Sequence, residues 1–288
     1  MSQDRAPAGL ATSTESSAAL RADLKGVDIT SGPRLFIVQF VIIAAFILAW
    51  QLLSGNTNRG QGVINEFYIG KPSTMISQVY SWVVTGTLFT NAWVTLQEAL
   101  LGFFVGTVTA VVLGLLLAVT ATGRAVFAPI VIGLYAVPRL GLAPVFLLLF
   151  GLGSGSKIAL ATVVVFFYTF FATYQGAREV DRELIDICRL MKGSRWQIIW
   201  RVTLPSTVSW IGLGMKISVP AAFVAALVGE ILASNVGLGA LMTRAANTFN
   251  PSGLLAAALV ATIMALLLHA IVARGVDYLL RWQNAGAL

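Results

Sequence analysis

The chain has 288 residues, of which 57% are hydrophobic and 11% are charged, and its formal net charge is +7. Soluble domains carry roughly 25% charged residues, so this composition excludes an ordinary soluble protein and indicates an integral membrane protein. The basic residues lie beside apolar runs, where they set topology and meet lipid headgroups of the bilayer, and we therefore expect no nucleic-acid binding.

The chain begins with a polar segment. Residues 1–30 are rich in Ala, Ser and Thr, carry mixed charge and contain no apolar core. This composition is typical of a disordered tail and not of a cleaved signal peptide. We expect a disordered cytoplasmic tail over residues 1–30, followed by a transmembrane domain over residues 31–284.

About six apolar runs follow, and a run of about 20 residues is long enough for a helix to cross the hydrocarbon core. The predicted fold is therefore an all-α membrane protein. The third run contains Arg139 and the prolines Pro129, Pro138 and Pro144, which predict a bent or broken helix because proline removes backbone donors. The predicted spans cover residues 35–53, 99–122, 125–151, 158–177, 206–230 and 251–273.

An aromatic stretch precedes the second span. Phe67–Thr90 is polar at its beginning and contains several Tyr, Trp and Phe residues, which favour the headgroup level of a bilayer. We interpret it as an interfacial helix, with a seventh crossing as the alternative.

Most Lys and Arg residues lie in the amino tail, in residues 178–205 and after the sixth run. The positive-inside rule places these segments, and with them both termini, in the cytoplasm. The glycine-rich Gly151–Lys157 then forms an external turn. It lacks the Gly before the Lys and the Ser or Thr after it that a phosphate-binding loop requires, so no nucleotide site is predicted.

Small residues recur every fourth position in the second run, at Gly102, Gly106, Ala110 and Gly114, and predict close helix packing. The chain has one cysteine and one histidine. Cys188 has no partner for an intrachain disulfide, and His269 is interpreted as a packing residue, so no metal site is predicted.

Residues 178–205 form a charged, amphipathic segment between spans four and five. Glu183–Met191 suits a short helix, Gly193 suits a left-handed helix stop, and Ser194 can cap a second helix that runs to about Val202. Pro205 then begins span five. A helix this short lies on the membrane or inserts into a groove on another protein.

This segment resembles the cytoplasmic signature of the inner-membrane permease subunits of binding-protein-dependent ABC importers. That signature runs Glu-Ala-Ala, three residues, Gly, nine residues, Ile, one residue, Leu-Pro. The corresponding residues here are Asp186, Ile187, Cys188, Val202, Leu204 and Pro205. Lys192 stands where the family has Gly, with Gly193 one residue later. Residues 68–80, 95–114, 138–157 and 228–239 look like the nitrate, sulfonate and taurine branch of this family.

The resemblance implies a permease in the bacterial inner membrane that pairs with a second permease subunit, favoured as a homodimer. It implies a cytoplasmic ABC ATPase dimer, which holds ATP and Mg²⁺, and an external solute-binding protein. This chain would hold no cofactor and would be no enzyme. The residues expected to contact the ATPase are Leu184, Asp186, Ile187, Cys188, Leu190, Gly193, Ser194, Arg195, Trp196, Ile199, Val202, Leu204 and Pro205.

Charged side chains inside apolar spans are costly to bury and are therefore candidates for the transport pathway or a gate. Four are predicted: Glu98, Arg139, Lys216 and Glu230. A small anion is the expected solute, with sulfonate or taurine first and nitrate, bicarbonate or a vitamin precursor as alternatives. An ion-gradient-driven carrier and a membrane scaffold are the competing classes of function.

Overall fold

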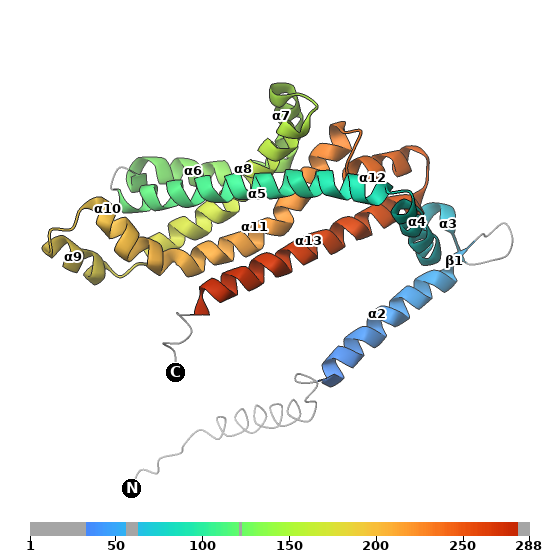
Figure 1. Cartoon of the computed structure of the whole chain (residues 1–288), viewed down its shortest axis with the longest axis horizontal. Helices are drawn as coiled ribbons and strands as arrows, with labels where there is room; N and C mark the ends of the chain where they lie inside the picture. Colours follow the sequence, from blue (N-terminus) through green and yellow to red (C-terminus); the bar gives the residue numbers. More distant parts are fainter. Residues whose placement is uncertain (1–32, 56–62, 121–122, 282–288) are drawn as a thin grey trace, which may run out of the picture. The chain divides into compact units, whose positions relative to one another are not determined.

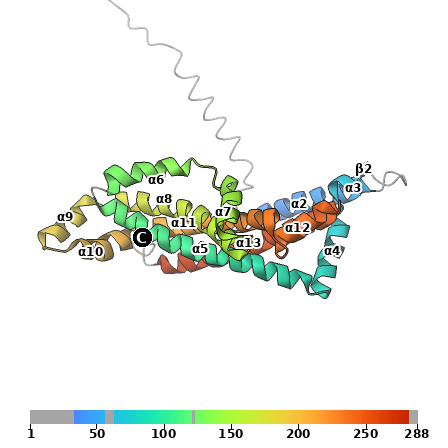
Figure 2. The ribbon, with the colours of Figure 1, turned by 90° about the horizontal axis from the view of Figure 1, so that it is seen from above.

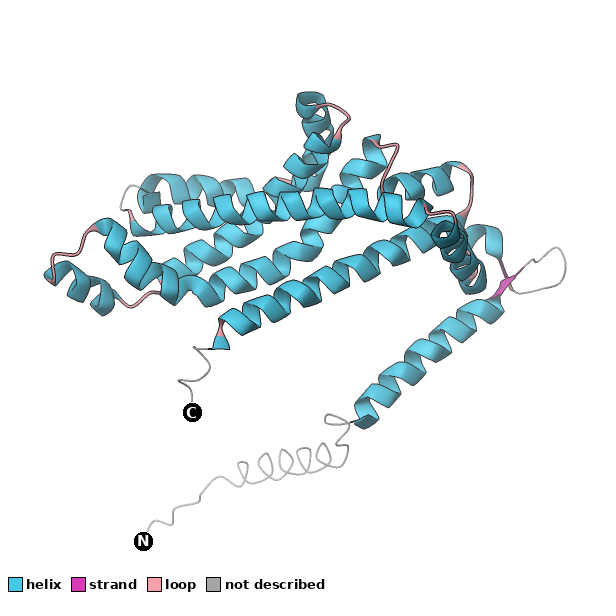
Figure 3. Ribbon diagram, in the orientation of Figure 1, coloured by secondary structure: helices cyan, strands magenta, loops and turns pink. Residues whose placement is uncertain are grey.

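The computed structural model describes residues 33–55, 63–120 and 123–281. The chain divides into two compact units, residues 1–64 and residues 65–288. Within the described parts nearly all of the chain is helical (Figures 1 and 3). The all-α fold predicted from the composition is confirmed.

The first unit contains helix α2, Pro33–Leu53, which has 21 residues and matches the first predicted span. Strand β1, Ser54–Gly55, follows it and pairs with β2, Ile64–Asn65. The predicted tail, residues 1–30, lies outside the described residues, and the single domain over 31–284 remains a prediction.

The second unit contains the remaining helices of the described chain. They are α3 Glu66–Ile69, α4 Pro72–Val84, α5 Thr87–Val119, η2 Gly123–Phe127, α6 Ala128–Tyr135, η3 Arg139–Leu142, α7 Ala143–Phe150, α8 Ser154–Arg178, α9 Arg182–Leu190, α10 Arg195–Ile198, η4 Ile199–Thr203, α11 Leu204–Ala233, α12 Leu238–Asn247 and α13 Pro251–Leu279.

Four helical segments of the second unit are long and apolar enough to cross a membrane: α5, α8, α10–η4–α11 as one stretch, and α13. A fifth crossing is possible if the bent pair formed by residues 125–135 and 139–150 is counted as one span. This pair turns through 84° at its break, as the prolines of the third predicted span indicated. The turn before α8 is also where it was expected, at Gly151–Gly153.

The second predicted span is wrong at its start. We expected one interfacial helix over Phe67–Thr90 and a span from residue 99, but α4 ends at Val84 and α5 begins at Thr87. Gly86 adopts a left-handed φ of 74°, which favours glycine and marks the true boundary. Since α4 has 13 residues, it is too short for the alternative seventh crossing.

Helices α5, α8, α11 and α13 run side by side along the second unit (Figures 1 and 2). The predicted small-residue ladder faces α8. A Cβ on Gly106 would lie 2.8 Å from Cβ of Val165, and one on Gly114 would lie 3.0 Å from Cγ2 of Thr173. The predicted close packing is therefore confirmed, because side chains larger than hydrogen would push the two helices apart.

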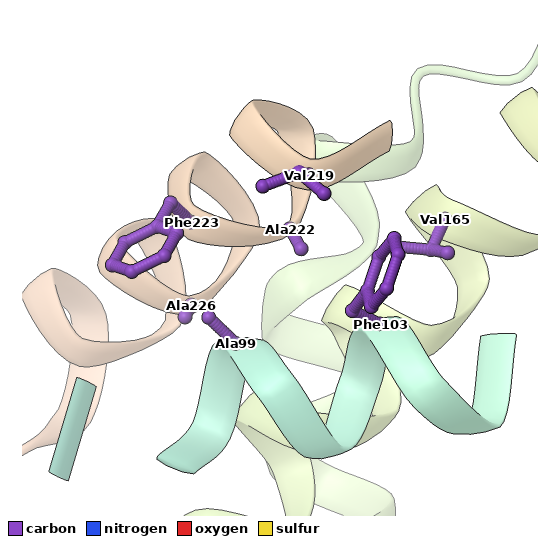
Figure 4. Close-up of a cluster of buried hydrophobic side chains, with 7 residues drawn as sticks. All are labelled: Ala99, Phe103, Val165, Val219, Ala222, Phe223 and Ala226. Atoms are coloured by element: carbon purple, nitrogen blue, oxygen red, sulfur yellow. The ribbon is translucent and has the colours of Figure 1, made fainter. Parts of the chain in front are cut away.

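The centre of this bundle is a cluster of buried apolar side chains from α5, α8 and α11 (Figure 4). Phe103 and Phe223 fill it, and smaller residues surround them, namely Ala99, Val165, Val219, Ala222 and Ala226. Alternation of large and small side chains allows dense packing between helices. The bundle thereby holds two opposite ends in fixed relation: α9 and α10 lie at one end, and α4 and α12 at the other (Figure 1).

Candidate functional site

Residues 178–205, which we call the coupling segment after the role that the family resemblance implies for it, form a helix, a turn and a second helix, as predicted. Asp181 caps α9 by accepting from the backbone N–H of Glu183 at 2.9 Å. Ser194 caps α10 in a reciprocal capping box: its Oγ accepts from Gln197 N at 3.2 Å, and Gln197 Oε1 accepts from Ser194 N at 2.7 Å. These caps satisfy backbone donors that a short helix leaves unpaired.

The turn between the two helices corrects the prediction for Gly193. The left-handed residue is Lys192, with a φ of 57°, whereas Gly193 has no positive φ. Lys192 also occupies the glycine position of the family signature, so the left-handed conformation falls on that position of the signature. Gly193 is required for another reason: a Cβ there would lie 2.7 Å from Sγ of Cys188.

The second helix of the coupling segment is not separate from span five, which corrects a further prediction. Residues Arg195–Ala233 form one helical stretch of 39 residues, in which η4 (Ile199–Thr203) is a wider π-type turn. Pro205 lies in the first turn of α11, where its missing N–H is tolerated because the preceding wide turn shifts the hydrogen-bond register.

Apolar side chains on α9 are exposed. Leu184 is 49% exposed, Ile187 54% and Met191 79%, and their spacing of three and four residues puts them on one face. They line a groove of about 440 Å³ together with Cys188, Gly193, Gln197, Arg201, Val202, Pro205 and Ser206. Asp186 and Arg189, which form an exposed ion pair at 3.2 Å, lie on the opposite face.

The opposite end of the bundle contains a cluster that we call the α12 anchor: Asn91, Thr95 and Glu230. Three consecutive backbone N–H groups at the start of α12 donate to it. Gly237 N donates to Asn91 Oδ1 at 2.8 Å, Leu238 N to Thr95 Oγ1 at 2.9 Å, and Gly239 N to Glu230 Oε2 at 2.6 Å. Thr95 Oγ1 donates in turn to Glu230 Oε1 at 2.7 Å.

Two further buried charged residues adjoin the α12 anchor. Glu98 is 2% exposed and lies close to Lys157, Glu230 and Ser154. Lys157 is 1% exposed, and its Nζ donates to the backbone oxygens of Leu152, of Gly153 at 3.0 Å and of Ala233 at 2.9 Å. The positive Lys157 at the carboxyl end of α11 and the negative Glu230 at the amino end of α12 both interact favourably with the helix dipoles. The cluster thus joins α5, α8, α11 and α12.

The other two predicted pathway residues lie apart from this cluster. Arg139 is at the break between α6 and α7, where its guanidinium carbon lies 4.4 Å from the ring centre of Tyr135 and 5.1 Å from that of Tyr168. Lys216 of α11 forms an ion pair with Asp277 of α13 at 2.6 Å. The structure therefore brings together Glu98 and Glu230 of the four, and it places Arg139 and Lys216 separately.

A family model described as "Binding-protein-dependent transport system inner membrane component" matches residues 110–284. The chain belongs to this family. The match includes the coupling segment and four of the long helices or their parts, so the resemblance based on the sequence is confirmed, and the protein is a multi-pass component of an inner membrane.

Two curated members of the permease families are similar over most of their length. The protein named "Putative aliphatic sulfonates transport permease protein SsuC" of Bacillus subtilis (strain 168) is 27% identical over 242 residues, which cover 84% of this chain and 86% of that protein. The formylaminopyrimidine transport permease protein ThiX of Halalkalibacterium halodurans is 29% identical over 227 residues, which cover 77% of this chain and 90% of that protein.

The fold is also similar to a solved structure of the MetNI methionine ABC transporter in an inward-facing conformation. The TM-score is 0.59, with 20% sequence identity over 68% of this chain and 97% of that chain. At 20% identity, this similarity supports the same fold and nothing about the solute.

Several residues of this family member's candidate sites were not predicted. Asn91 and Thr95 precede the predicted Glu98 at helical spacing and form a polar stripe with it on α5. This stripe is a usable signal, but the predicted span began at residue 99 and left both residues outside it. Lys157 was assigned to an external turn. Its role depends on the oxygen of Ala233, 76 residues away, and no local pattern reveals such a contact.

Proposed function

We propose that this chain is the permease subunit of an ABC importer, and that its coupling segment docks onto a separate cytoplasmic ATPase dimer. The observation that supports this most directly is the exposed apolar face of α9 at one end of the bundle. An amphipathic helix with apolar residues three and four positions apart is the usual ligand of a hydrophobic groove. ATP and Mg²⁺ belong to the ATPase in this proposal, and the permease itself catalyses no reaction.

The orientation of the protein follows from this docking. The coupling segment and both termini face the cytoplasm of a bacterial cell, and α4, α12 and the α12 anchor face outward, where an external solute-binding protein delivers the solute. Glu98 and Glu230 then lie at the external end of the pathway, where Glu230 holds α12 against the bundle and Glu98 lies beside it. In this proposal the pair controls an external gate of the pathway.

A second permease subunit, favoured as an identical copy, completes the pathway in this proposal. Large apolar side chains on α6 and α7 support it: Leu148 is 87% exposed, Leu149 72% and Ile130 55%. Such surfaces are covered either by lipid or by another helix in a membrane. We assign part of this surface to the second subunit and the remainder to the bilayer.

The proposed solute is a small anion, with a sulfonate or taurine favoured. The similarity to a sulfonate permease supports this choice, but the relative that transports a pyrimidine is equally similar. Nitrate, bicarbonate and a vitamin precursor therefore remain alternatives. The alternative class of function, an ion-gradient-driven carrier, would require no ATPase at the coupling segment.

The test is isolation of the chain from detergent with its bound partners, identified by mass spectrometry. We expect an ABC ATPase with the wild type and its loss with Ile187→Asp, which puts a charge on the exposed apolar face of α9. Arg189→Gln is the matched control on the opposite face and should retain the ATPase. Recovery of no ATPase with the wild type would favour the gradient-driven carrier.

A further inference from the structure

Arg139 lies at mid-depth in the helical bundle. The hollow around it is lined by Val164 and Tyr168, each ten residues from an end of α8, Ser154–Arg178. At about 1.5 Å per residue, the ends of this helix are about 15 Å away in both directions. An arginine side chain is too short to cover that distance, so Arg139 does not reach either membrane surface by extending along the helix.

The guanidinium of Arg139 is held in place by aromatic rings. Its central carbon lies 4.4 Å from the ring centre of Tyr135, 5.1 Å from that of Tyr168 and 5.4 Å from that of Phe167. Nη2 donates to the backbone oxygen of Tyr135 at 3.2 Å. Aromatic faces attract a cation and fix its orientation without neutralising its charge.

No carboxylate of the described residues neutralises Arg139. The ion pairs in that part of the chain join Arg189 to Asp186 and Lys216 to Asp277. Nη1 of Arg139 is buried and has no hydrogen-bond partner there. By contrast, Lys157 donates to three backbone oxygens. A charge held at this depth without an opposite charge is costly, and a bound anion would offset that cost.

The hollow is suited to a small organic anion. Its volume is about 560 Å³, within the usual range of small-molecule sites. The walls beside the aromatic rings are small or apolar, and they include Ala136, Gly141, Ala221 and Val224. A planar guanidinium donates two parallel hydrogen bonds to an oxyanion such as a sulfonate or carboxylate, while apolar walls accept the carbon portion of the solute.

We propose that Arg139 and its hollow form an oxyanion-binding station at mid-depth, which contacts the solute on its way through the permease and selects for a negatively charged head group. This inference rests on the proposed importer function and assigns the substrate class within it. The station lies at the break between α6 and α7: the non-helical Ala136–Pro138 segment separates α6 from η3, and Arg139 at the start of η3 lies against Tyr168 of α8.

The test is uptake by cells expressing the whole transporter, with ethanesulfonate, nitrate and bicarbonate as probes. We expect Arg139→Gln to reduce uptake of the transported anion about tenfold or more, because hydrogen bonds to a charged group are the stronger class. Arg139→Lys keeps the charge but not the paired donors, so its uptake rate should lie between those of the wild type and Arg139→Gln. Arg281→Gln is the matched control, since it removes a guanidinium that also lies against an aromatic ring, 4.9 Å from that of Tyr278, but does not line the hollow. It should leave uptake near the wild-type rate.

Partner recovery separates this inference from the proposed function. If the ATPase is recovered with Arg139→Gln and uptake is nevertheless lost, the station is supported. Uptake at the wild-type rate by Arg139→Gln would overturn it, as would uptake of none of the three anions by the wild type.

If the wild type binds no ATPase, the importer proposal fails. The shift in Tm of the purified chain with each anion then decides: a shift in the wild type that Arg139→Gln abolishes supports the station, and no shift overturns it.

Discussion

His269 Nδ1 lies 3.0 Å from the backbone oxygen of Lys216, an oxygen that has lost its usual helical donor. In an α-helix the oxygen of residue 216 accepts from the N–H of residue 220, but residue 220 is proline and has no N–H. Because a carbonyl oxygen only accepts, Nδ1 of His269 must carry the hydrogen. The histidine of α13 thus replaces the donor that Pro220 removes from α11.

This replacement predicts that the two positions are energetically coupled. We expect His269→Ala to lower the free energy of unfolding by about 1 kcal/mol in the wild-type background, the usual net contribution of one hydrogen bond. In Pro220→Ala the helix supplies its own donor, and the added His269→Ala change should cost much less. Denaturation of all four proteins in detergent measures the coupling. An equal cost in both backgrounds would show that His269 acts by packing alone.

The turn of the coupling segment predicts opposite effects for two neighbouring substitutions. Lys192→Gly should stabilise the turn by up to about 1 kcal/mol, because glycine adopts a left-handed φ without steric cost. Gly193→Ala should destabilise it, since its Cβ would lie 2.7 Å from Sγ and 2.8 Å from the backbone oxygen of Cys188. Recovery of the ATPase and hydrogen exchange of residues 182–198 report on the turn. If Gly193→Ala were neutral, the close contact with Cys188 would be wrong.

The α12 anchor predicts that Thr95→Val loosens α12. The substitution removes the donor to Glu230 and leaves the buried N–H of Leu238 without its acceptor, at a cost of about 2–3 kcal/mol. Thr109→Val is a matched control on the same helix, because Oγ1 of Thr109 bonds only to oxygens of its own helix. Hydrogen exchange should become faster over Leu238–Asn247 in the first variant and not in the second. Equal exchange in both would remove Thr95 from the anchor.

The ion pair between Lys216 and Asp277 predicts only a small effect on stability. The Asp277 side chain is 65% exposed, so solvent screens the pair and its contribution should be at most about 1 kcal/mol. Lys216→Glu should lower Tm slightly, and the double variant with Asp277→Lys should restore it. If the double variant is as unstable as the single one, the 2.6 Å pair does not join α11 to α13 in solution.

The close packing of α5 on α8 predicts that Gly106→Ala is destabilising by about 1–3 kcal/mol, because its Cβ would lie 2.7 Å from the backbone oxygen of Thr162. Gly133→Ala in α6 is the matched control, since a Cβ there meets nothing within 4 Å. The second substitution should be neutral or slightly stabilising. Thermal unfolding in detergent compares the two, and similar losses would contradict the proposed contact.

The membrane helices were predictable because an uncharged run of about 20 residues has few other physical solutions. Their ends were less predictable. Polarity suggested that the second span began near residue 99, whereas the backbone breaks at Gly86, and α5 continues through polar residues that find partners inside the protein. Hydrophobicity alone does not reveal those partners.

The charged candidates were partly predictable for the same reason. The cost of burying charge in a membrane singled out Glu98, Arg139, Lys216 and Glu230, but not what each contacts. The three N–H groups that bind the α12 anchor come from residues more than a hundred positions away from Asn91 and Thr95. Likewise, the signature spacing located the turn at Lys192 and Gly193 without showing which residue adopts the left-handed conformation.

The uninterrupted helical stretch Arg195–Ala233 has a mechanical consequence. Its 39 residues, at about 1.5 Å each, give a length along the helix of about 58 Å, from the capped turn to Ala233, whose oxygen accepts from Lys157. A tilt of about 5° at Ser194 would displace the far end by about 5 Å, roughly one helical turn. No loop separates the two ends, so only the wide turn η4 and the proline at 220 can absorb such a tilt. A small rotation at the proposed docking face would then reach the hydrogen bonds that hold α12.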